Sequence, residues 1–213
     1  MAVASEVAEE FIVELKKAYI KRLGKNILNN DEYPHMINKA AFDKCVKDSK
    51  AYSDKVFFGG KGDPDSLRFE PTILYPMDID DEIVNRELFN PLLPVVPYKD
   101  REIDKVLDVI ASREKGLALY VFTKDIPWAE KVMSTQQFGG GCINEVCLQL
   151  MVKGAPFNGV GHSGMGAYHG EWGFKEFTHP QTVLIGSDKF NLTLREHPHN
   201  RKWKNLAIHL FER

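Results

Sequence analysis

A glycine-rich run holds the residues whose types and spacing most suggest chemistry. Residues 156–170 read PFNGVGHSGMGAYHG, with five glycines around Ser163. Glycine is needed where φ is positive or where the backbone approaches another group closely. Ordering such an irregular loop costs conformational entropy, and binding residues concentrate on loops held by a packed body. The run therefore predicts a loop that shapes a binding site.

One interpretation of this run is a phosphate-binding turn. Gly159, Gly161 and Gly164 match the pattern G-x-G-x-x-G. That fingerprint requires a strand before it, a helix after it and an acidic residue about twenty positions further on. Pro156 stands where the strand should end, and the next acidic residue at a useful distance is Asp188, in a polar tail. The pattern alone therefore gives weak support for a dinucleotide-binding turn.

Two other sites are compatible with these residues. Ser163, Asp188 and His197 follow the order of a hydrolase triad, but the second glycine of Gly-His-Ser-Gly comes one place too early for a nucleophile elbow. His197 and His199 could bind a metal ion, but the sequence offers no third ligand nearby. We therefore predict no metal site.

The run most closely resembles the C-terminal signature of the aldehyde dehydrogenase superfamily, P-F-G-G-x-G-x-S-G-x-G. Asn158 stands where the family usually has glycine, and the following Tyr168-His169-Gly170 is similar to the short dimeric branch that oxidises fatty and aromatic aldehydes. The resemblance implies that five residues of the run line a substrate pocket or form a structural loop: Phe157, Gly159, Gly161, Ser163 and Gly164.

A second motif, Glu87-Leu88-Phe89-Asn90-Pro91, resembles the family pattern E-[IVL]-F-G-P. In the family the glutamate binds the nicotinamide ribose and the phenylalanine packs beside the ring, so the resemblance implies that Glu87 and Phe89 bind NAD or NADP. Asn90 replaces a glycine, and Arg86 replaces a residue that is commonly acidic. From the residues alone, Glu87 could equally be a surface carboxylate and Phe89 a core residue.

A third resemblance lies in two stretches. Leu117 to Phe122 reads L-A-L-Y-V-F, as in the family, and the sequence at Gly140 to Asn144 matches G-G-x-x-x-N when the pattern is counted from Gly139. It implies that Asn144 belongs to the same pocket or loop. The unbroken apolar run at 117–122 also predicts a strand buried on both faces, as in a parallel sheet.

The remaining pattern predicts the elements that would position these residues. Ser5 and Asn38 are expected to cap two helices, Asp100 caps a third with apolar residues at helical spacing, and Pro127 lies in the first turn of a fourth. Strands are expected at 56–58, 69–74, 117–122 and 142–144. The sequence therefore predicts an α/β fold with a mainly parallel sheet and helices on both faces, which the resemblance identifies with the aldehyde dehydrogenase catalytic domain.

The resemblance covers residues 6–186 and only the last part of the family pattern. In the family a cysteine thiolate attacks the aldehyde and a glutamate activates water, but the Gly-Gln-x-Cys and Leu-Glu-Leu-Gly-Gly motifs are absent from these 213 residues. In the family the nucleophile precedes the glutamate that corresponds to Glu87. Cys142 and Cys147 follow Glu87 in the sequence, so neither is assigned as the nucleophile, and no catalytic residue is assigned. We expect the chain alone to oxidise no aldehyde and to bind no cofactor well.

We expect three parts: a catalytic-domain segment at 1–180, an oligomerisation strand at 181–186 and a polar extension at 187–213. The resemblance implies that the strand, made of Thr182, Val183, Leu184 and Ile185, pairs with a second subunit. The expected partner is a second copy or a complementary N-terminal half, and only the complete enzyme would take an aldehyde. The alternative is a non-catalytic dimerisation or interaction module.

The composition excludes several classes of function. Hydrophobic residues make up 43% and charged residues 27%, typical of a soluble globular protein. A formal net charge of -2 gives no reason to expect nucleic acid or an anionic membrane as partner. No apolar run approaches the ~20 residues that span a bilayer. No signal peptide is recognisable, and three cysteines without metal-like spacing predict buried or half-buried thiols in a reducing cytoplasm.

Overall fold

The computed structural model describes residues 1–189 and 209 and has a mixed α/β architecture, which confirms the predicted fold class. The helices are α1 (Ser5–Leu23), α2 (Lys39–Ala51), α3 (Ile103–Ser112), α4 (Ile126–Thr135) and α5 (Glu171–Glu176). The strands are β1 (Ala2–Ala4), β2 (Val56–Phe58), β3 (Gly62–Asp63), β4 (Arg68–Phe69), β5 (Thr72–Leu74), β6 (Leu92–Pro94), β7 (Val96–Tyr98), β8 (Ala118–Val121), β9 (Gly140–Ile143), β10 (Phe157–Asn158) and β11 (Ala167–Tyr168). Short 3-10 helices include η3 (Glu82–Asn85), η5 (Leu148–Met151) and η6 (Gly161–Ser163).

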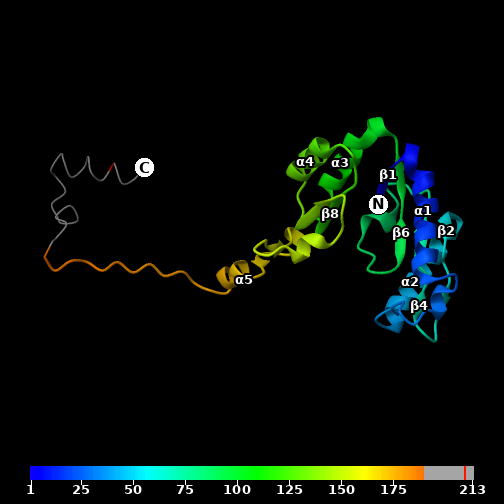
Figure 1. Ribbon diagram of the computed structural model, residues 1–213, viewed down its shortest axis with the longest axis horizontal. Helices are drawn as coiled ribbons and strands as arrows, with labels where there is room; N and C mark the ends of the chain where they lie inside the picture. Colours follow the sequence, from blue (N-terminus) through cyan, green and yellow to red (C-terminus); the bar gives the residue numbers. More distant parts are fainter. Residues whose placement is uncertain (190–208, 210–213) are drawn as a thin grey trace.

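Figure 1 shows two bodies of secondary structure followed by α5 and an extended segment. The first body holds α1, α2 and the strands up to β7, and the second holds α3, α4, β8 and β9. A side-chain hydrogen bond links the two bodies: Arg113, just after α3, donates to the carbonyl of Ile79 in the first body.

Strand β5 lies at the centre of the first body. It pairs in parallel with β6 and antiparallel with β2, in the order β2-β5-β6. All three of its residues are buried, and the buried Thr72 hydroxyl accepts from Gly60 N and donates to Glu70 O, both at 2.8 Å. Helix α1 covers one side of this sheet by packing Ile12 against Ile73 and Val95.

Helix α2 covers the other core cluster of the first body. Its predicted cap is confirmed, since the Asn38 side chain accepts a hydrogen bond of 2.8 Å from Ala41 N. Phe42 and Cys45 are buried in a cluster with Leu74, Leu92 and other apolar residues. Asp48 is buried further along the same helix, one turn after Cys45. A fixed helix thus carries a carboxylate close to the core.

The second body is built on a parallel pair. Strands β8 and β9 run in register from Ala118 with Gly140 to Val121 with Ile143. Close approach of the strands requires glycine, because a Cβ on Gly141 would lie 2.3 Å from the Leu119 carbonyl oxygen. Helix α4 begins at the predicted proline turn and buries Ala129 and Val132 against Val121.

The expectation that residues 117–122 are buried on both faces is wrong. Leu117, Ala118 and Phe122 are exposed, and only Val121 is buried. In the part of the chain that the structure describes, this sheet has only two strands, so each strand has a free edge. An apolar sequence indicates which strand can be buried, but burial also requires a second layer.

Several local predictions differ from the structure. Ser5 is the first residue of α1 and Ala4 is its N-cap, because residues 2–4 form the unpredicted strand β1, which pairs with β7. The cap predicted at Asp100 is wrong, because Asp100 begins a 3-10 helix, Asp100–Glu102, and Glu102 is the N-cap of α3. The strand predicted at 142–144 spans Gly140–Ile143. Residues 182–185 form no strand in this single chain, since a strand needs a partner for its backbone groups. Their pairing with a second subunit stays a prediction.

The three thiols also differ from one another. Cys45 is buried and Cys142 half-buried, as predicted, but Cys147 is exposed. Among residues 1–189 and 209, no helix combines the length and apolar character needed to cross a membrane.

Candidate functional site

The segment between η3 and β6 presents two side chains outward. From Arg86 to Asn90 exposure alternates: Arg86, Leu88 and Asn90 are partly buried, whereas Glu87 and Phe89 are exposed. Leu88 packs against the core cluster of α2, and the Asn90 side chain accepts a hydrogen bond of 3.0 Å from Leu92 N. Anchored and exposed side chains thus alternate along this segment.

Phe89 is the most unusual residue of this segment. Its side chain is 89% exposed, and its φ of 46° lies in the left-handed region. A bulky residue there is strained, by roughly 1–3 kcal/mol, and such strain clusters at ligand-binding and active sites. The alternative interpretation of Phe89 as a core residue is wrong. Glu87 is exposed as well, which fits both a binding carboxylate and a plain surface residue.

Asn144 has a clear structural role after β9. Its φ is 58°, a conformation that asparagine tolerates better than most residues. Its side chain accepts from Thr123 N and donates to Thr123 O, each at 2.8 Å. Both polar groups of the amide are therefore used to tie the end of β9 to the end of β8.

The glycine-rich run forms a compact turn on β10 and β11. Phe157 pairs with Tyr168 across these strands, and their rings meet edge to face with centroids 5.2 Å apart. At Gly159 an added Cβ would lie 2.2 Å from the Ser163 carbonyl oxygen, so this close approach requires glycine. Gly161 and Gly164 have φ of 61° and 146°, which glycine adopts without strain.

Ser163 closes the same turn. Its hydroxyl accepts from Val160 N at 2.8 Å and donates to Val160 O at 3.1 Å. Within residues 1–189 and 209, Ser163 has no recorded hydrogen bond to Asp188, and His197 and His199 lie outside the described residues. The geometry therefore indicates a loop-closing serine.

A cavity of about 410 Å³ lies where the turn meets the β8–β9 sheet. A Cβ on Gly139 would lie 2.0 Å from the Asn158 carbonyl oxygen, which shows how closely the turn packs on the sheet. The cavity lining is mostly apolar and includes Leu117, Leu150 and Phe157. Its size and character suit part of a small organic ligand.

A chain of polar contacts runs along one wall of this cavity. Cys142 donates to Gln149 Oε1 at 3.0 Å, Gln149 Nε2 donates to the Tyr120 hydroxyl at 3.0 Å, and that hydroxyl donates to Cys147 Sγ at 3.6 Å. The sequence analysis did not identify Tyr120, Gln149 or Cys147 as lining residues. They come from β8 and from the segment after β9, and no pattern in the sequence links them.

Arg86 makes the main electrostatic interaction of residues 86–90. Its guanidinium lies 2.7 Å from Asp48 Oδ1, and this hydrogen bond raises the pKa of Arg86 above its usual range. Among residues 1–189 and 209 there is no group of three or more histidine, cysteine, aspartate or glutamate side chains that could hold a metal ion.

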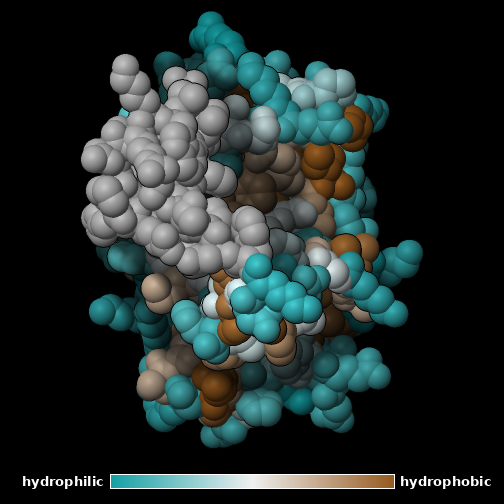
Figure 2. Space-filling model, turned by 90° about the vertical axis from the view of Figure 1, so that its left-hand side faces the viewer, coloured by the Kyte–Doolittle hydropathy of each residue, from teal (hydrophilic) through white to brown (hydrophobic). Residues whose placement is uncertain are grey.

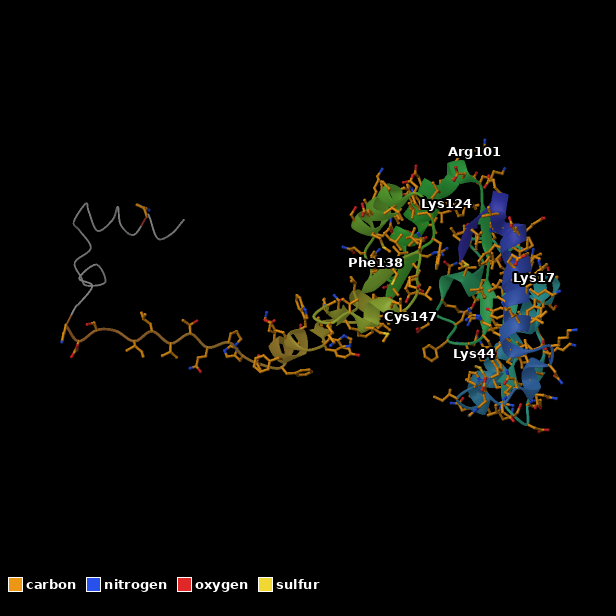
Figure 3. All side chains as sticks on the ribbon, viewed as in Figure 1. Lys17, Lys44, Arg101, Lys124, Phe138 and Cys147 are labelled. Carbon is orange, nitrogen blue, oxygen red and sulfur yellow. The ribbon has the colours of Figure 1, made fainter. Side chains whose placement is uncertain are left out.

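The two groups of residues lie on different bodies. Glu87 and Phe89 belong to the loop that leads into β6, and in Figure 1 this loop projects from the first body on the side of the second. Figure 3 shows Cys147 and Phe138 on the second body, whereas Lys17 and Lys44 mark helices α1 and α2 of the first. No direct hydrogen bond between the 86–91 loop and the glycine-rich turn is recorded within the described residues.

Exposed apolar side chains follow β9 in the sequence, in and after η5 and in and after α5. They include Leu148, Met151, Val152, Phe174 and Phe177. Figure 2 shows brown apolar residues exposed among the teal polar ones on the face it presents.

The model of the aldehyde dehydrogenase family matches residues 1–183. Aldehyde dehydrogenase family 3 member H1 of Arabidopsis thaliana is 36% identical over 198 residues, which cover 92% of this chain and 40% of the relative. The dimeric NADP-preferring aldehyde dehydrogenase of Mus musculus is 35% identical over 183 residues, or 85% of this chain and 39% of the relative.

Among solved structures, the substrate-bound state of Staphylococcus aureus AldH is similar with a TM-score of 0.91 and 31% identity. The match covers 98% of this chain and 45% of that chain. The chain thus spans about two fifths of the length of the curated relatives it matches.

Proposed function

The chain belongs to the aldehyde dehydrogenase family, and we propose that it is the C-terminal part of the catalytic domain of an NAD(P)-dependent enzyme that oxidises aldehydes to carboxylic acids. Three motifs in family order support this position: residues 87–91, Gly140 to Asn144, and residues 156–170. The dimeric relative that prefers NADP supports the choice of a nicotinamide cofactor.

The observation that carries the proposal is the outward projection of Glu87 and Phe89 from an anchored segment. An exposed carboxylate can accept hydrogen bonds from two ribose hydroxyls, and an exposed phenyl ring offers a flat face to a nicotinamide. The strained φ of Phe89 is the kind of backbone conformation found at ligand clamps. Both residues therefore fit a dinucleotide, which when bound would accept the hydride of the aldehyde.

The aldehyde would lie against the second body. The apolar cavity beside Phe157 suits the hydrocarbon part of an aldehyde, and its apolar walls would exclude water from it. Asn144, Gly159, Gly161, Ser163 and Gly164 would shape the site through the backbone, because their side chains or φ angles serve the local fold.

The thiolate and the base would come from a complementary N-terminal segment. The 213 residues contain neither motif, and catalytic groups that act as a unit leave little activity when some are absent. We therefore propose that this chain alone oxidises no aldehyde and holds the dinucleotide only weakly.

The test measures formation of reduced nicotinamide from a fatty or aromatic aldehyde, with NAD and with NADP. The purified chain is assayed alone and after co-expression with the N-terminal segment of a family 3 relative. Activity only with the segment supports the proposal, and activity that depends on the aldehyde in the chain alone contradicts it. Circular dichroism and gel filtration show that both components are folded, so that an inactive mixture of folded, associated components also counts against the proposal.

A second function, a non-catalytic interaction module, is favoured by residues 182–185. Val183, Leu184 and Ile185 are all strongly exposed apolar residues on an extended backbone. Such a segment can add a strand to the sheet edge of another subunit. The same division of the chain is proposed for both functions. Residues 1–180 form the catalytic-domain segment, residues 181–186 pair with a second copy, and residues 187–213 are a polar extension.

A further inference from the structure

We propose that Arg86 is a positioning residue, which acts through its ion pair with Asp48 to hold Glu87 and Phe89 on the outward side of the segment before β6. The functional consequence rests on the proposed function, whereas the structural claim stands without it. Nothing in the family pattern requires arginine here, since this position is commonly acidic.

The ion pair joins two side chains that are largely removed from solvent. Arg86 Nη2 lies 2.7 Å from Asp48 Oδ1, and the Asp48 and Arg86 side chains are 10% and 27% exposed. A second contact of Arg86, to Glu82 at 3.7 Å, involves an exposed carboxylate and is weaker. Removing one partner of a buried pair leaves an uncompensated buried charge, so the pair resists separation.

The rest of the segment has few other anchors. Residues 86–90 donate no recorded hydrogen bond through their backbone N–H groups in the described part of the chain. The segment is therefore held by its side chains: Arg86 on Asp48, Leu88 in the core cluster, and Asn90 on Leu92 N. Glu87 and Phe89 alternate with these anchors and are exposed.

Helix α2 makes Asp48 a fixed point. Asn38 caps its first turn, and Phe42 and Cys45 hold the same side of the helix in the core. The second oxygen of Asp48 and the Nε of Arg86 are buried without a hydrogen bond partner. The pair thus depends on one strong hydrogen bond, and both partners are needed to keep the segment in place.

Limited proteolysis with chymotrypsin tests the structural claim in this chain. Phe89 and Phe177 are each 89% exposed, so Phe177 serves as an internal reference for cleavage at Phe89. In Arg86→Met, freeing the segment is expected to raise the ratio of the two cleavage rates about tenfold, because proteases cut locally opened chain. Asp48→Asn should raise the ratio in the same direction.

The matched control is Arg68→Met. Arg68 is also a largely buried arginine, 18% exposed, that binds Leu28 O at 3.1 Å and lies 3.6 Å from Asp31. It makes no recorded contact with residues 86–91, so its loss should lower the melting temperature without changing the cleavage ratio. Arg86→Lys keeps the charge and should restore the ratio to within about threefold of wild type.

The functional arm uses the complemented enzyme. Arg86→Met should raise KM for the dinucleotide while leaving KM for the aldehyde unchanged, and Arg86→Lys should restore most of the difference. An unchanged cleavage ratio in a folded Arg86→Met chain would overturn the inference. A raised ratio with no change in KM for the dinucleotide would keep the positioning claim and reject the cofactor role of Glu87 and Phe89.

Discussion

Asn144 and Thr123 are joined by two hydrogen bonds of opposite direction, each 2.8 Å long, which link the chain beyond β9 to the chain beyond β8. Both strands are thereby held together at their carboxyl ends. In α/β folds this edge of the sheet is where ligands bind. The cavity lies toward the other end of these strands, beside Leu117, Ala118, Gly139 and Gly140, so this relationship serves the stability of the second body.

Asn144→Ala should destabilise the chain by roughly 1–3 kcal/mol, because it removes both hydrogen bonds. Alanine also lacks the short polar side chain that helps asparagine to adopt a positive φ. Asn144→Gly should cost less, since glycine accepts the φ of 58°. Urea unfolding measures both. Equal stability of all three proteins would show that the hydrogen bonds contribute nothing.

Glu87→Gln should weaken dinucleotide binding by the complemented enzyme roughly 10–100-fold, the loss expected for hydrogen bonds to a charged group. Glu10→Gln is the matched control, because Glu10 is an exposed carboxylate on helix α1 of the same body. KM for NAD and NADP is measured at saturating aldehyde. A similar effect of both substitutions would assign the change to general charge.

Gly159→Ala should open the glycine-rich turn, because the new Cβ would overlap the Ser163 carbonyl. Such overpacking costs roughly 1–3 kcal/mol. Trp172 reports on this turn, since its indole donates to Gly154 O at 3.0 Å. With Trp128 and Trp203 replaced by phenylalanine, Trp172 fluorescence should shift to longer wavelength in Gly159→Ala. Gly186→Ala, where nothing lies within 4 Å, should leave the spectrum unchanged.

Leu184→Asp should reduce self-association of the chain. The exposed apolar side chains at 183–185 can pair with a second copy, and a buried charge at their centre opposes that contact. Multi-angle light scattering over a range of concentrations gives the mass of each protein. Lys189→Asp changes charge just beyond the segment and serves as the control. A monomeric wild-type chain at all concentrations would contradict the dimer proposal.

Stability should fall as the pH rises from about 9 to about 12. Burial, with a smaller effect of the Asp48 charge, raises the pKa of the Cys45 thiol from 9.0 to about 12. In this range the unfolded chain releases the proton and the folded chain keeps it, so unfolding becomes more favourable. Cys45→Ala should make the fall in unfolding free energy shallower between about pH 9 and about pH 12. Identical slopes of unfolding free energy against pH in the two proteins would show that the thiol titrates alike in the folded and unfolded states. Burial raises the pKa of Tyr33 as well, so part of the slope remains in both proteins.

The parts of the fold that local patterns determine were predictable from the sequence. Asn38 as a helix cap, the helix after Asp100 and the proline turn of α4 follow from residue preferences within one or two turns. The exposure of Glu87 fits both interpretations that the sequence allowed, a cofactor-binding carboxylate and a plain surface residue. From the residues alone, Phe89 could equally have been a core residue, and only the resemblance placed it beside a ligand.

Features that depend on distant contacts could not be predicted. Tyr120 and Gln149 meet at one cavity wall although 29 positions separate them. Strand β1 is too short for a periodic signal and forms because β7 offers it a parallel partner. The exposure of Leu117 depends on whether a second layer covers the sheet, which no local pattern encodes.

The alternation from Arg86 to Asn90 also limits how this segment can change in evolution. Replacing one side chain alters one contact, but deleting or inserting a single codon between Arg86 and Asn90 would change the spacing of the three anchors, Arg86, Leu88 and Asn90. The anchors could then no longer be engaged together, and the segment would lose the arrangement that leaves Glu87 and Phe89 exposed. The segment should therefore tolerate substitutions much more readily than changes in length.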